Sequence, residues 1–561
     1  MEENSIRETE ENKNSTRKRI SNLFQPRKRI LINLTVLIIF TIYFVWATYY
    51  YLQNNPPGWE YFGYTTCTGY GFLVIIYAFT IYGYLKFYLL RTSTYLLFKN
   101  DIFKSTFFKL NNAIDNHATS CVLLRHLKIV FYAAVIIAIG IYLALDTTDN
   151  RLRLIPLIGL VIFLIIGYLL SNNRSKVKWR TIFWGVILQF IFGLLTIRWN
   201  IGRNILECIG AKVDTLLNYA FKAAEFPYGE ELVKNQQLFA FRSLSTVYFI
   251  SFLVNILYYY GIMQNIVLAI GSLLKLIMGT SICESVNSAA NIFLGMTEAP
   301  LILAPYLKDL TASEIHSVMT SGFATVAGSV LAAYISFGAR PQDLITSSIM
   351  SAPAALCYSK LLYPETEVIR MKKKNIQQIK IEYNSVLEAA TKGVASAMNL
   401  VHGIISGLIA FLAAVYFVNG VLGWIGELVG QTEPYWSLEL ITGKIFIPIS
   451  YIMGVPWKEC ESVGTLIGIK TMVNEFVAFQ RMGAMSKENL LSPRTKVIAT
   501  YAICGFSNPA SIGIMTSALN TLIPNKTDVI TRVVMRAWFG GAIVCFMTAC
   551  IAGIVMPDEA V

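Results

Sequence analysis

Apolar stretches of about 20 residues recur along this chain, and each is long enough for a helix to cross a bilayer core about 30 Å thick. Lipid offers exposed backbone groups no hydrogen-bond partner, so spanning segments must form helices or closed barrels. Hydrophobic residues make up 55% of the 561 residues and charged residues only 14%, a balance that soluble domains do not show. These features predict an all-α polytopic membrane protein.

Eleven transmembrane helices are predicted, with boundaries good to a few residues. They lie near 31–52, 66–85, 129–146, 154–171, 182–199, 241–260, 313–337, 343–361, 400–422, 494–517 and 532–556. Lys and Arg concentrate in the loops at 86–128, 172–180 and 360–380, whereas the segment 53–60 has none. Because basic loops stay in the cytoplasm, we expect a cytoplasmic N-terminus and an extracellular C-terminus.

The net charge of +13 comes from basic residues in these short loops. Membrane orientation explains it, so the lipid bilayer is the expected partner and no nucleic acid is predicted. Residues 1–30 are polar and mixed in charge, as expected for a disordered cytoplasmic tail.

Two apolar stretches, 280–305 and 457–480, contain Glu, Asn, Gly and Pro residues that a plain membrane span would exclude. Both contain the sequence Cys-Glu-Ser-Val, and in both a second glutamate follows the first by 14 residues (Glu284 to Glu298 and Glu461 to Glu475). Irregular backbone at membrane depth is tolerated only where protein or a water-filled cavity surrounds it. We therefore predict two re-entrant helical hairpins, each made of two half-helices.

Three predicted spans separate the two hairpins, and an odd number places them on opposite sides of the membrane. Met-Gly precedes each hairpin (278–279 and 453–454), and Gly-Phe lies in the helix after each (322–323 and 505–506). These matches predict an inverted repeat, an arrangement in which transporters bind substrate and ion near the membrane midplane. Two amphipathic segments, 203–225 and 384–398, are expected to lie along the membrane interface.

The paired carboxylates are the strongest candidates for function, because charged groups at membrane depth are costly and rarely incidental. Glu298 and Glu475 follow the hairpin turns, where they would accept hydrogen bonds from a polar ligand or, alternatively, bind the backbone N–H groups of the half-helices. Glu284 and Glu461 lie nearer the hairpin entrances. For these two, a structural and a functional role both remain open.

Uncharged side chains whose oxygen atoms could bind a cation lie in the same segments as these carboxylates or in the next predicted helix. Asn291 and Thr325 carry oxygens that suit a hard cation, although such residues also bridge packed membrane helices. In the stretch GFSNPAS (505–511), Pro509 interrupts an apolar helix beside three polar side chains. That interruption fits ligand binding and a simple kink equally well. Neither a nucleophile–base pair nor a cluster of metal ligands indicates an enzyme.

Several motifs resemble the concentrative nucleoside transporter family. They are NIFLGMTEAPLILAPYLKDLTASEIHSVMTSGFATVAGSVLAAYI (291–335), IMSAPAAL (349–356), KLLYPETE (360–367), VNEFVAF (473–479) and CGFSNPASIGI (504–514). The likeness runs in order from about residue 150 to 556, and the three spans before residue 150 are similar to the extra helices of eukaryotic members. It implies a homotrimeric, elevator-type secondary active symporter that imports nucleosides with sodium or protons and needs no other cofactor.

The resemblance also assigns site residues. Nucleobase contacts fall on Gly295, Met296, Thr297 and Glu298, with Phe506 close to the base, and ribose contacts fall on Glu475, Asn508 and Ser511. The sodium site falls on the side chains of Asn291 and Thr325 and the carbonyl groups of Leu294 and Val326. The resemblance thus favours sodium ligation over simple helix packing for Asn291 and Thr325.

Met296 stands where pyrimidine-preferring and broad-specificity members of the family have glutamine. The pair Gly295-Met296 with Thr325-Val326 resembles the purine-preferring type. A thioether cannot donate a hydrogen bond to a pyrimidine carbonyl, but it packs well against a larger purine ring. Purine nucleosides and uridine are therefore the expected substrates.

The expected organisation has six parts. They are the tail (1–30), three extra helices (31–149), scaffold helices with the first interfacial helix (150–270), hairpin 1 with its following helices (271–361), a basic loop with the second interfacial helix and a scaffold helix (362–450), and hairpin 2 with the last helices (451–561). A proton-coupled or broad-specificity nucleoside carrier is the main alternative. An intramembrane enzyme and an amino-acid carrier fit the residues less well. The plasma membrane is the expected location.

Overall fold

The computed structural model describes residues 34–54, 70–92, 122–148, 150–236, 238–304, 306–368, 383, 385–431, 433 and 435–556. The predicted tail at 1–30, most of the outer segment at 53–60 and the last five residues lie outside these ranges. Contacts divide the chain into two compact units, Met1–Ile141 and Tyr142–Val561, which are described separately.

The first unit contains the helix Leu34–Asn54 and helix α2 (Tyr70–Thr92), which pack through aromatic side chains. The rings of Phe44 and Tyr77 stack with their centroids 4.0 Å apart, and the Tyr70 hydroxyl donates to Thr48 Oγ1 at 2.9 Å. Helix α4 (Val122–Asp146) begins in this unit and ends in the second.

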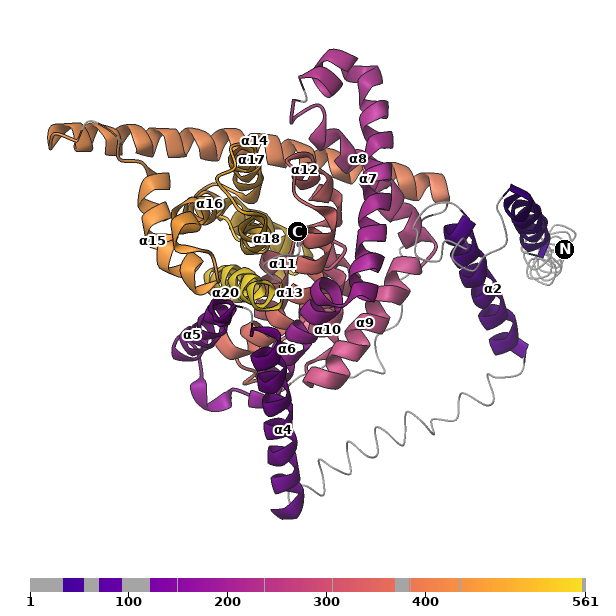
Figure 1. Cartoon of the computed structure of the whole chain (residues 1–561), viewed down its shortest axis with the longest axis horizontal. Helices are drawn as coiled ribbons and strands as arrows, with labels where there is room; N and C mark the ends of the chain where they lie inside the picture. Colours follow the sequence, from indigo (N-terminus) through magenta and orange to yellow (C-terminus); the bar gives the residue numbers. More distant parts are fainter. Residues whose placement is uncertain are drawn as a thin grey trace, which may run out of the picture. The chain divides into compact units, whose positions relative to one another are not determined.

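The second unit is helical throughout its described residues, which include no strand. Its first half contains α5 (Ile155–Leu169), α6 (Trp179–Gly193), α7 (Asn200–Tyr228), α8 (Ser243–Tyr259), α9 (Ile262–Met278), α10 (Ile282–Ala290), α11 (Ala312–Ala324), α12 (Leu331–Ser336) and α13 (Pro341–Leu362). Its second half contains α14 (Val386–Leu428), α15 (Leu438–Ile452), α16 (Cys460–Met472), α17 (Glu475–Lys487), α18 (Pro493–Ile503), α19 (Pro509–Leu522) and α20 (Thr527–Val555). Figure 1 shows their arrangement.

Six helical segments of the described chain are long and apolar enough to cross a membrane, or seven if the bent pair α8–α9 counts as one. They are Leu34–Asn54, Arg151–Leu169, Trp179–Arg198, Ala312–Ser336, Val386–Leu428 and Pro524–Val555. The predicted spans at 66–85 and 129–146 coincide with shorter apolar helices, and those at 343–361 and 494–517 with α13 and the pair α18–α19. The all-helical multi-pass class is confirmed, and the count of eleven stays a prediction.

The internal repeat extends beyond the matched hairpin motifs. Helix α9 precedes hairpin 1 and packs on α10, and α15 precedes hairpin 2 and packs on α16, while α8 and α14 pack against each other. Gly279 and Gly454 end the two preceding helices with positive φ values of 73° and 92°, a conformation that favours glycine. The same order of elements therefore leads into each hairpin.

Helix α14 corrects one expectation. The segments 384–398 and 400–422 were predicted as a separate interfacial helix and a span, but they form one helix of 43 residues. The junction around residue 399 contains no Pro or Gly, so nothing interrupts the backbone hydrogen bonds. At 1.5 Å per residue the helix is about 65 Å long, and Figure 1 shows it crossing the upper part of the picture.

Two of the predicted spans are broken near their middles. Between α11 and α12 the backbone is extended at Thr325 (φ −125°, ψ 169°), and between α18 and α19 residues 504–508 leave the helix before Pro509. The most buried candidate span, Pro524–Val555, contains α20, and 89% of its most apolar 18-residue stretch is buried inside the protein. This helix packs against both α11 and α18. The breaks are thus enclosed by protein, as irregular backbone at membrane depth requires.

Candidate functional site

One cavity brings together the tips of both hairpins, the break before α19 and one face of α14. About 680 Å³ of space not filled by protein atoms lies within it, and part of this space opens to the outside. All eight residues expected to contact substrate line it, namely Gly295, Met296, Thr297, Glu298, Glu475, Phe506, Asn508 and Ser511. They come from three segments far apart in the sequence, and tertiary folding places them around a single volume.

The tip of hairpin 1 forms a tight turn between α10 and a short 3-10 helix, Ala299–Leu303. Glu298 caps this turn, because its N–H donates to the Gly295 carbonyl at 3.1 Å and its carboxylate accepts from the Gly295 N–H at 3.4 Å. Among the described residues, no cationic side chain lies within 4 Å of this carboxylate. Met296 is 6% exposed and packs closely over Gly322 of α11.

Glu475 occupies the first position of α17 in hairpin 2 and is 1% exposed. Its Oε1 accepts a hydrogen bond from the Tyr334 hydroxyl at 3.2 Å, and its Oε2 accepts one from Asn508 Nδ2 at 2.7 Å. The N-terminus of a helix favours a negative charge at this position. Two donors and a helix end therefore hold a deeply buried carboxylate at the cavity wall.

Asn508 is fixed by the break in the chain. It is the N-cap of α19, where its Oδ1 accepts from the Ser511 N–H at 2.9 Å and its Nδ2 points to Glu475. Pro509 fills the first helical position, where a missing N–H costs nothing. The stretch GFSNPAS is thus a helix start that positions a side-chain amide.

Besides the two hairpins and the break before α19, helix α14 lines the cavity, and the sequence did not indicate this role. Helix α14 contributes Leu400, Gly403, Ile404, Gly407 and Leu408, which are spaced as one helical face. Only the small residues at 403 and 407 hinted at close approach, and such pairs are common at ordinary helix–helix contacts. Asn474, Ala327 and Val330 also line the cavity.

The residues expected to hold sodium lie directly behind this cavity. Asn291 is completely buried, and its Nδ2 donates to the Asn287 carbonyl at 3.0 Å while its Oδ1 has no hydrogen-bond partner. The Thr325 hydroxyl donates to the Ser321 carbonyl at 2.9 Å, which leaves its lone pairs available. Leu294 and Val326 are each 1% exposed. Buried oxygens without partners are rare in proteins, and a cation would satisfy them.

A backbone contact joins this ion region to the cavity. Gly328 donates its N–H to the Phe293 carbonyl at 3.1 Å, so the break after α11 is bonded to the hairpin 1 loop. A Cβ at position 328 would lie 2.5 Å from that carbonyl oxygen, which only glycine avoids. Leu294 and Val326 immediately precede the cavity-lining residues Gly295 and Ala327. An ion bound between the two segments would therefore order the hairpin tip.

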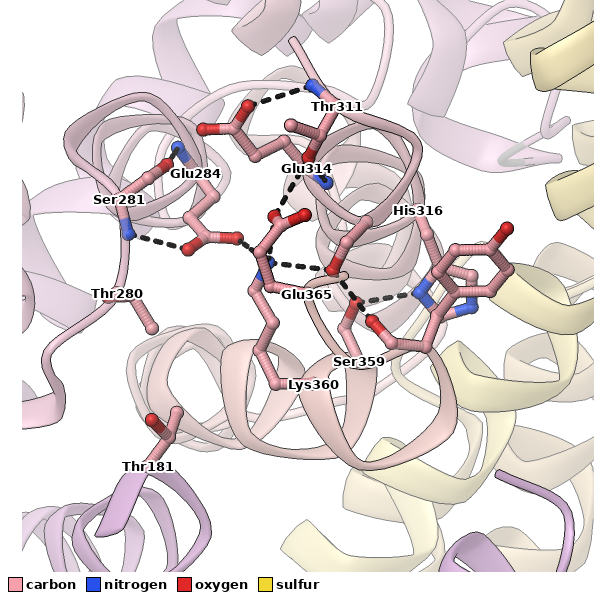
Figure 2. A network of polar contacts seen from close by, with 12 residues as sticks. Thr181, Thr280, Ser281, Glu284, Thr311, Glu314, His316, Ser359, Lys360 and Glu365 are labelled. Atoms are coloured by element: carbon pink, nitrogen blue, oxygen red, sulfur yellow. Dashed lines mark hydrogen bonds and ion pairs between the residues drawn. The ribbon is translucent and has the colours of Figure 1, made fainter. Parts of the chain in front are cut away.

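Glu284 has a structural role (Figure 2). Its Oε1 accepts from the Ser281 N–H at 2.6 Å in a reciprocal capping box at the start of α10. Its Oε2 lies 2.7 Å from Lys360 Nζ, and Glu365 lies 3.6 Å from the same ammonium. This network fastens the entrance of hairpin 1 to the end of α13.

Glu461, the counterpart of Glu284 in the repeat, has a different environment. It pairs with Lys444 at 2.8 Å, and both side chains are more than half exposed. Exposed ion pairs contribute little to stability. The shared Cys-Glu-Ser-Val motif thus has unequal roles in the two hairpins.

The described residues contain no group of three or more His, Cys, Asp or Glu side chains that could hold a metal. The fold and cavity define a multi-pass helical membrane carrier whose two hairpins meet at one largely apolar cavity that carries a few buried polar groups. Comparison with known proteins agrees. Residues 158–231, 240–341 and 343–553 match the family models "Na+ dependent nucleoside transporter N-terminus", "Nucleoside recognition" and "Na+ dependent nucleoside transporter C-terminus".

Named relatives give the same result. The chain is 41% identical over 442 residues to sodium/nucleoside cotransporter 2 of Rattus norvegicus, covering 76% of this chain and 66% of the relative. It is 39% identical over 469 residues to sodium/nucleoside cotransporter 1 of the same species, covering 81% and 71%. The structure of CNTnw in an inward-facing substrate-bound state matches with a TM-score of 0.68 and 33% identity, covering 72% of this chain and 98% of that one.

The chain belongs to the concentrative nucleoside transporter family, and the prediction made from its motifs is confirmed. It spans slightly less than two thirds of the length of rat cotransporter 2. The relatives are named as cotransporters, in keeping with a carrier and not an enzyme.

Proposed function

We propose that this protein is a secondary active symporter that imports nucleosides together with sodium by alternating access. The observation that carries the proposal is the convergence of both hairpin tips and the GFSNPAS break on one cavity. A carrier needs a site whose two sides can open in turn, and two matched hairpins provide the two sides.

Glu475 is the proposed ribose-binding carboxylate. A ribose presents neighbouring hydroxyl donors, and Glu475 together with Asn508 and Ser511 offers acceptors and donors at one end of the cavity. Because the Glu475 carboxylate is already fixed by Tyr334 and Asn508, it needs little reorganisation to bind sugar. A sugar without these hydroxyls would leave buried polar groups unpaired and would be rejected.

The base would lie at the other end, against the hairpin 1 tip and Phe506. Gly295, Met296, Thr297 and Glu298 form one wall there, with Phe506 offering an aromatic face. The buried Met296 thioether gives this wall an apolar surface in place of an amide. This supports the preference for purine nucleosides and uridine over cytidine and thymidine.

Sodium would bind between the hairpin 1 loop and the break after α11. The unpartnered Oδ1 of Asn291, the Thr325 hydroxyl and the carbonyls of Leu294 and Val326 are the oxygens that a hard cation prefers. Ion and nucleoside would then help each other to bind, since both order the same hairpin tip. The ion is a transported partner, and no further cofactor is proposed.

Assembly and location follow the family. We propose a homotrimer in the plasma membrane, with the N-terminus in the cytoplasm and the C-terminus outside. The support is the family relationship and the excess of Lys and Arg in alternate loops of the sequence.

Uptake of labelled guanosine and uridine into cells expressing the protein tests the proposal, in sodium medium and in choline medium at pH 7.4 and pH 5.5. We expect guanosine uptake that requires sodium and exceeds uridine uptake. The half-buried carboxylate of Glu298, which has no cationic partner among the described residues, favours one alternative, proton coupling.

Uptake in choline medium that rises at pH 5.5 would show that protons, and not sodium, drive transport. If neither nucleoside enters, although surface labelling shows the protein at the membrane, nucleoside transport itself is refuted.

A further inference from the structure

Lys470 is a fully buried lysine that the proposed site leaves without a role. It lies in the last turn of α16, in the first half of hairpin 2, and is 0% exposed. Its ammonium donates to the Ser507 hydroxyl, and no carboxylate of the described residues lies within 4 Å of it. The other buried lysine, Lys360, has two carboxylate partners (Figure 2). Lysine is almost never fully buried without such a partner.

The ammonium lies where two broken helices meet. Ser507 belongs to the break between α18 and α19, and Cys545 of α20 connects this break to the one after α11. The Cys545 thiol donates to the carbonyl oxygens of Cys504 at 3.4 Å and of Ala324 at 3.7 Å.

Helices α11 and α18 both end at this junction. Within the described part of the chain, neither C-cap residue, Thr325 or Cys504, donates its N–H back into its helix. The last carbonyl groups of a helix carry partial negative charge and attract a cation. Through its bond to Ser507, the Lys470 ammonium is a cation that the protein itself places at the break after α18, and Cys545 links this break to the end of α11.

The internal repeat shows what the lysine replaces. Asn291, the proposed sodium ligand, lies seven residues before Glu298 in hairpin 1. The residue seven before Glu475 in hairpin 2 is Gly468, which has no side chain to ligate an ion, and Lys470 follows two residues later. Hairpin 1 therefore offers neutral oxygens beside a broken helix, whereas hairpin 2 brings a positive charge to the corresponding break.

We propose that Lys470 is a tethered cation, which takes in hairpin 2 the role that sodium has in hairpin 1. It holds hairpin 2 against the α18–α19 break through its hydrogen bond to the Ser507 hydroxyl. This inference rests on the proposed sodium-coupled function. Under this proposal the carrier uses one exchangeable cation, sodium, and one permanent cation, the Lys470 ammonium. Without the ammonium, the Ser507 hydroxyl and the helix-end carbonyls would form a second oxygen-lined place for sodium.

Guanosine binding to the purified full-length protein, measured by calorimetry over a series of sodium concentrations below saturation, tests this inference. The slope of log affinity against log sodium counts the ions that bind with the nucleoside, and we expect about 1 for the unsubstituted protein and about 2 for K470A. K470R keeps the charge, so its slope should stay at about 1. K470M fills the space without charge, and its affinity should fall at least about tenfold.

A K470A slope that stays at the value of the unsubstituted protein overturns the tethered cation. If K470A does not fold, K470M and K470R decide: equally tight guanosine binding by both overturns it, and weaker binding by K470M alone supports it. K444A is the matched control, because Lys444 is exposed and remote from the cavity lining. An unsubstituted protein that binds guanosine without any sodium dependence would refute the proposed sodium coupling, on which this inference rests, whereas a sodium slope unaltered in K470A overturns the role of Lys470 alone.

Discussion

Replacing Glu475 by glutamine is the sharpest test of the proposed ribose site. The carboxylate is 1% exposed and accepts hydrogen bonds from Tyr334 at 3.2 Å and Asn508 at 2.7 Å. A glutamine amide has only one accepting oxygen, so its NH₂ group must face one of these donors. The substitution therefore removes the charge and also disturbs the group that would receive the sugar hydroxyl.

The expected size follows from the bond that is lost. A hydrogen bond to a charged group contributes about 1.5–3 kcal/mol. At about 1.4 kcal/mol for each factor of ten, E475Q should weaken guanosine binding about 10- to 150-fold. E461Q is the matched control: the repeat places Glu461 in the other half-helix of the same hairpin, but its side chain is 59% exposed.

The assay compares guanosine with 2′-deoxyguanosine and 3′-deoxyguanosine in sodium medium, with surface labelling to correct for the amount of protein. The unsubstituted protein should discriminate against at least one deoxy compound, and E475Q should lose that discrimination. Equal weakening of all three nucleosides by E475Q would refute the idea that this carboxylate contacts the sugar. E461Q should transport all three as the unsubstituted protein does.

Three further predictions concern the ion site, the base and the hairpin entrance. N291A should raise the sodium concentration for half-maximal guanosine uptake by about tenfold or more, because a buried oxygen ligand is lost; an unchanged sodium dependence would remove Asn291 from the ion site. M296Q should raise uptake of cytidine relative to guanosine by about tenfold, as expected for one new hydrogen bond to a pyrimidine carbonyl, and an unaltered ratio would show that Met296 does not face the base. E284A should destabilise the protein by about 1.5–3 kcal/mol, since it removes the capping box of α10 and the nearer of the two carboxylates that pair with Lys360. In thermal unfolding in detergent, E461A should melt close to the unsubstituted protein, and equal losses in E284A and E461A would contradict the difference in burial.

The sequence by itself determined the class of protein, the family and the places where chemistry is concentrated. Polar residues such as Glu298, Glu475 and Asn508 stand out in apolar segments because each carries a cost at membrane depth that the chain must compensate. The repeat of Cys-Glu-Ser-Val identified both hairpins, and Pro509 beside Asn508 indicated one of the two helix breaks. All of these are local signals.

Tertiary structure alone decided which polar groups meet and how deeply each is buried. Glu284 and Glu461 share a motif, yet one is enclosed with Lys360 and the other faces outward with Lys444. Helix α14 lines the cavity with Leu, Ile and Gly residues that are common in any membrane helix. Lys470 lies in the last turn of a helix, where lysine is common, so the sequence does not indicate its burial. The physical reason is that burial and partnership depend on contacts between segments that are separate in the sequence, such as Glu284 with Lys360 and Tyr334 with Glu475, which no local pattern of residues encodes.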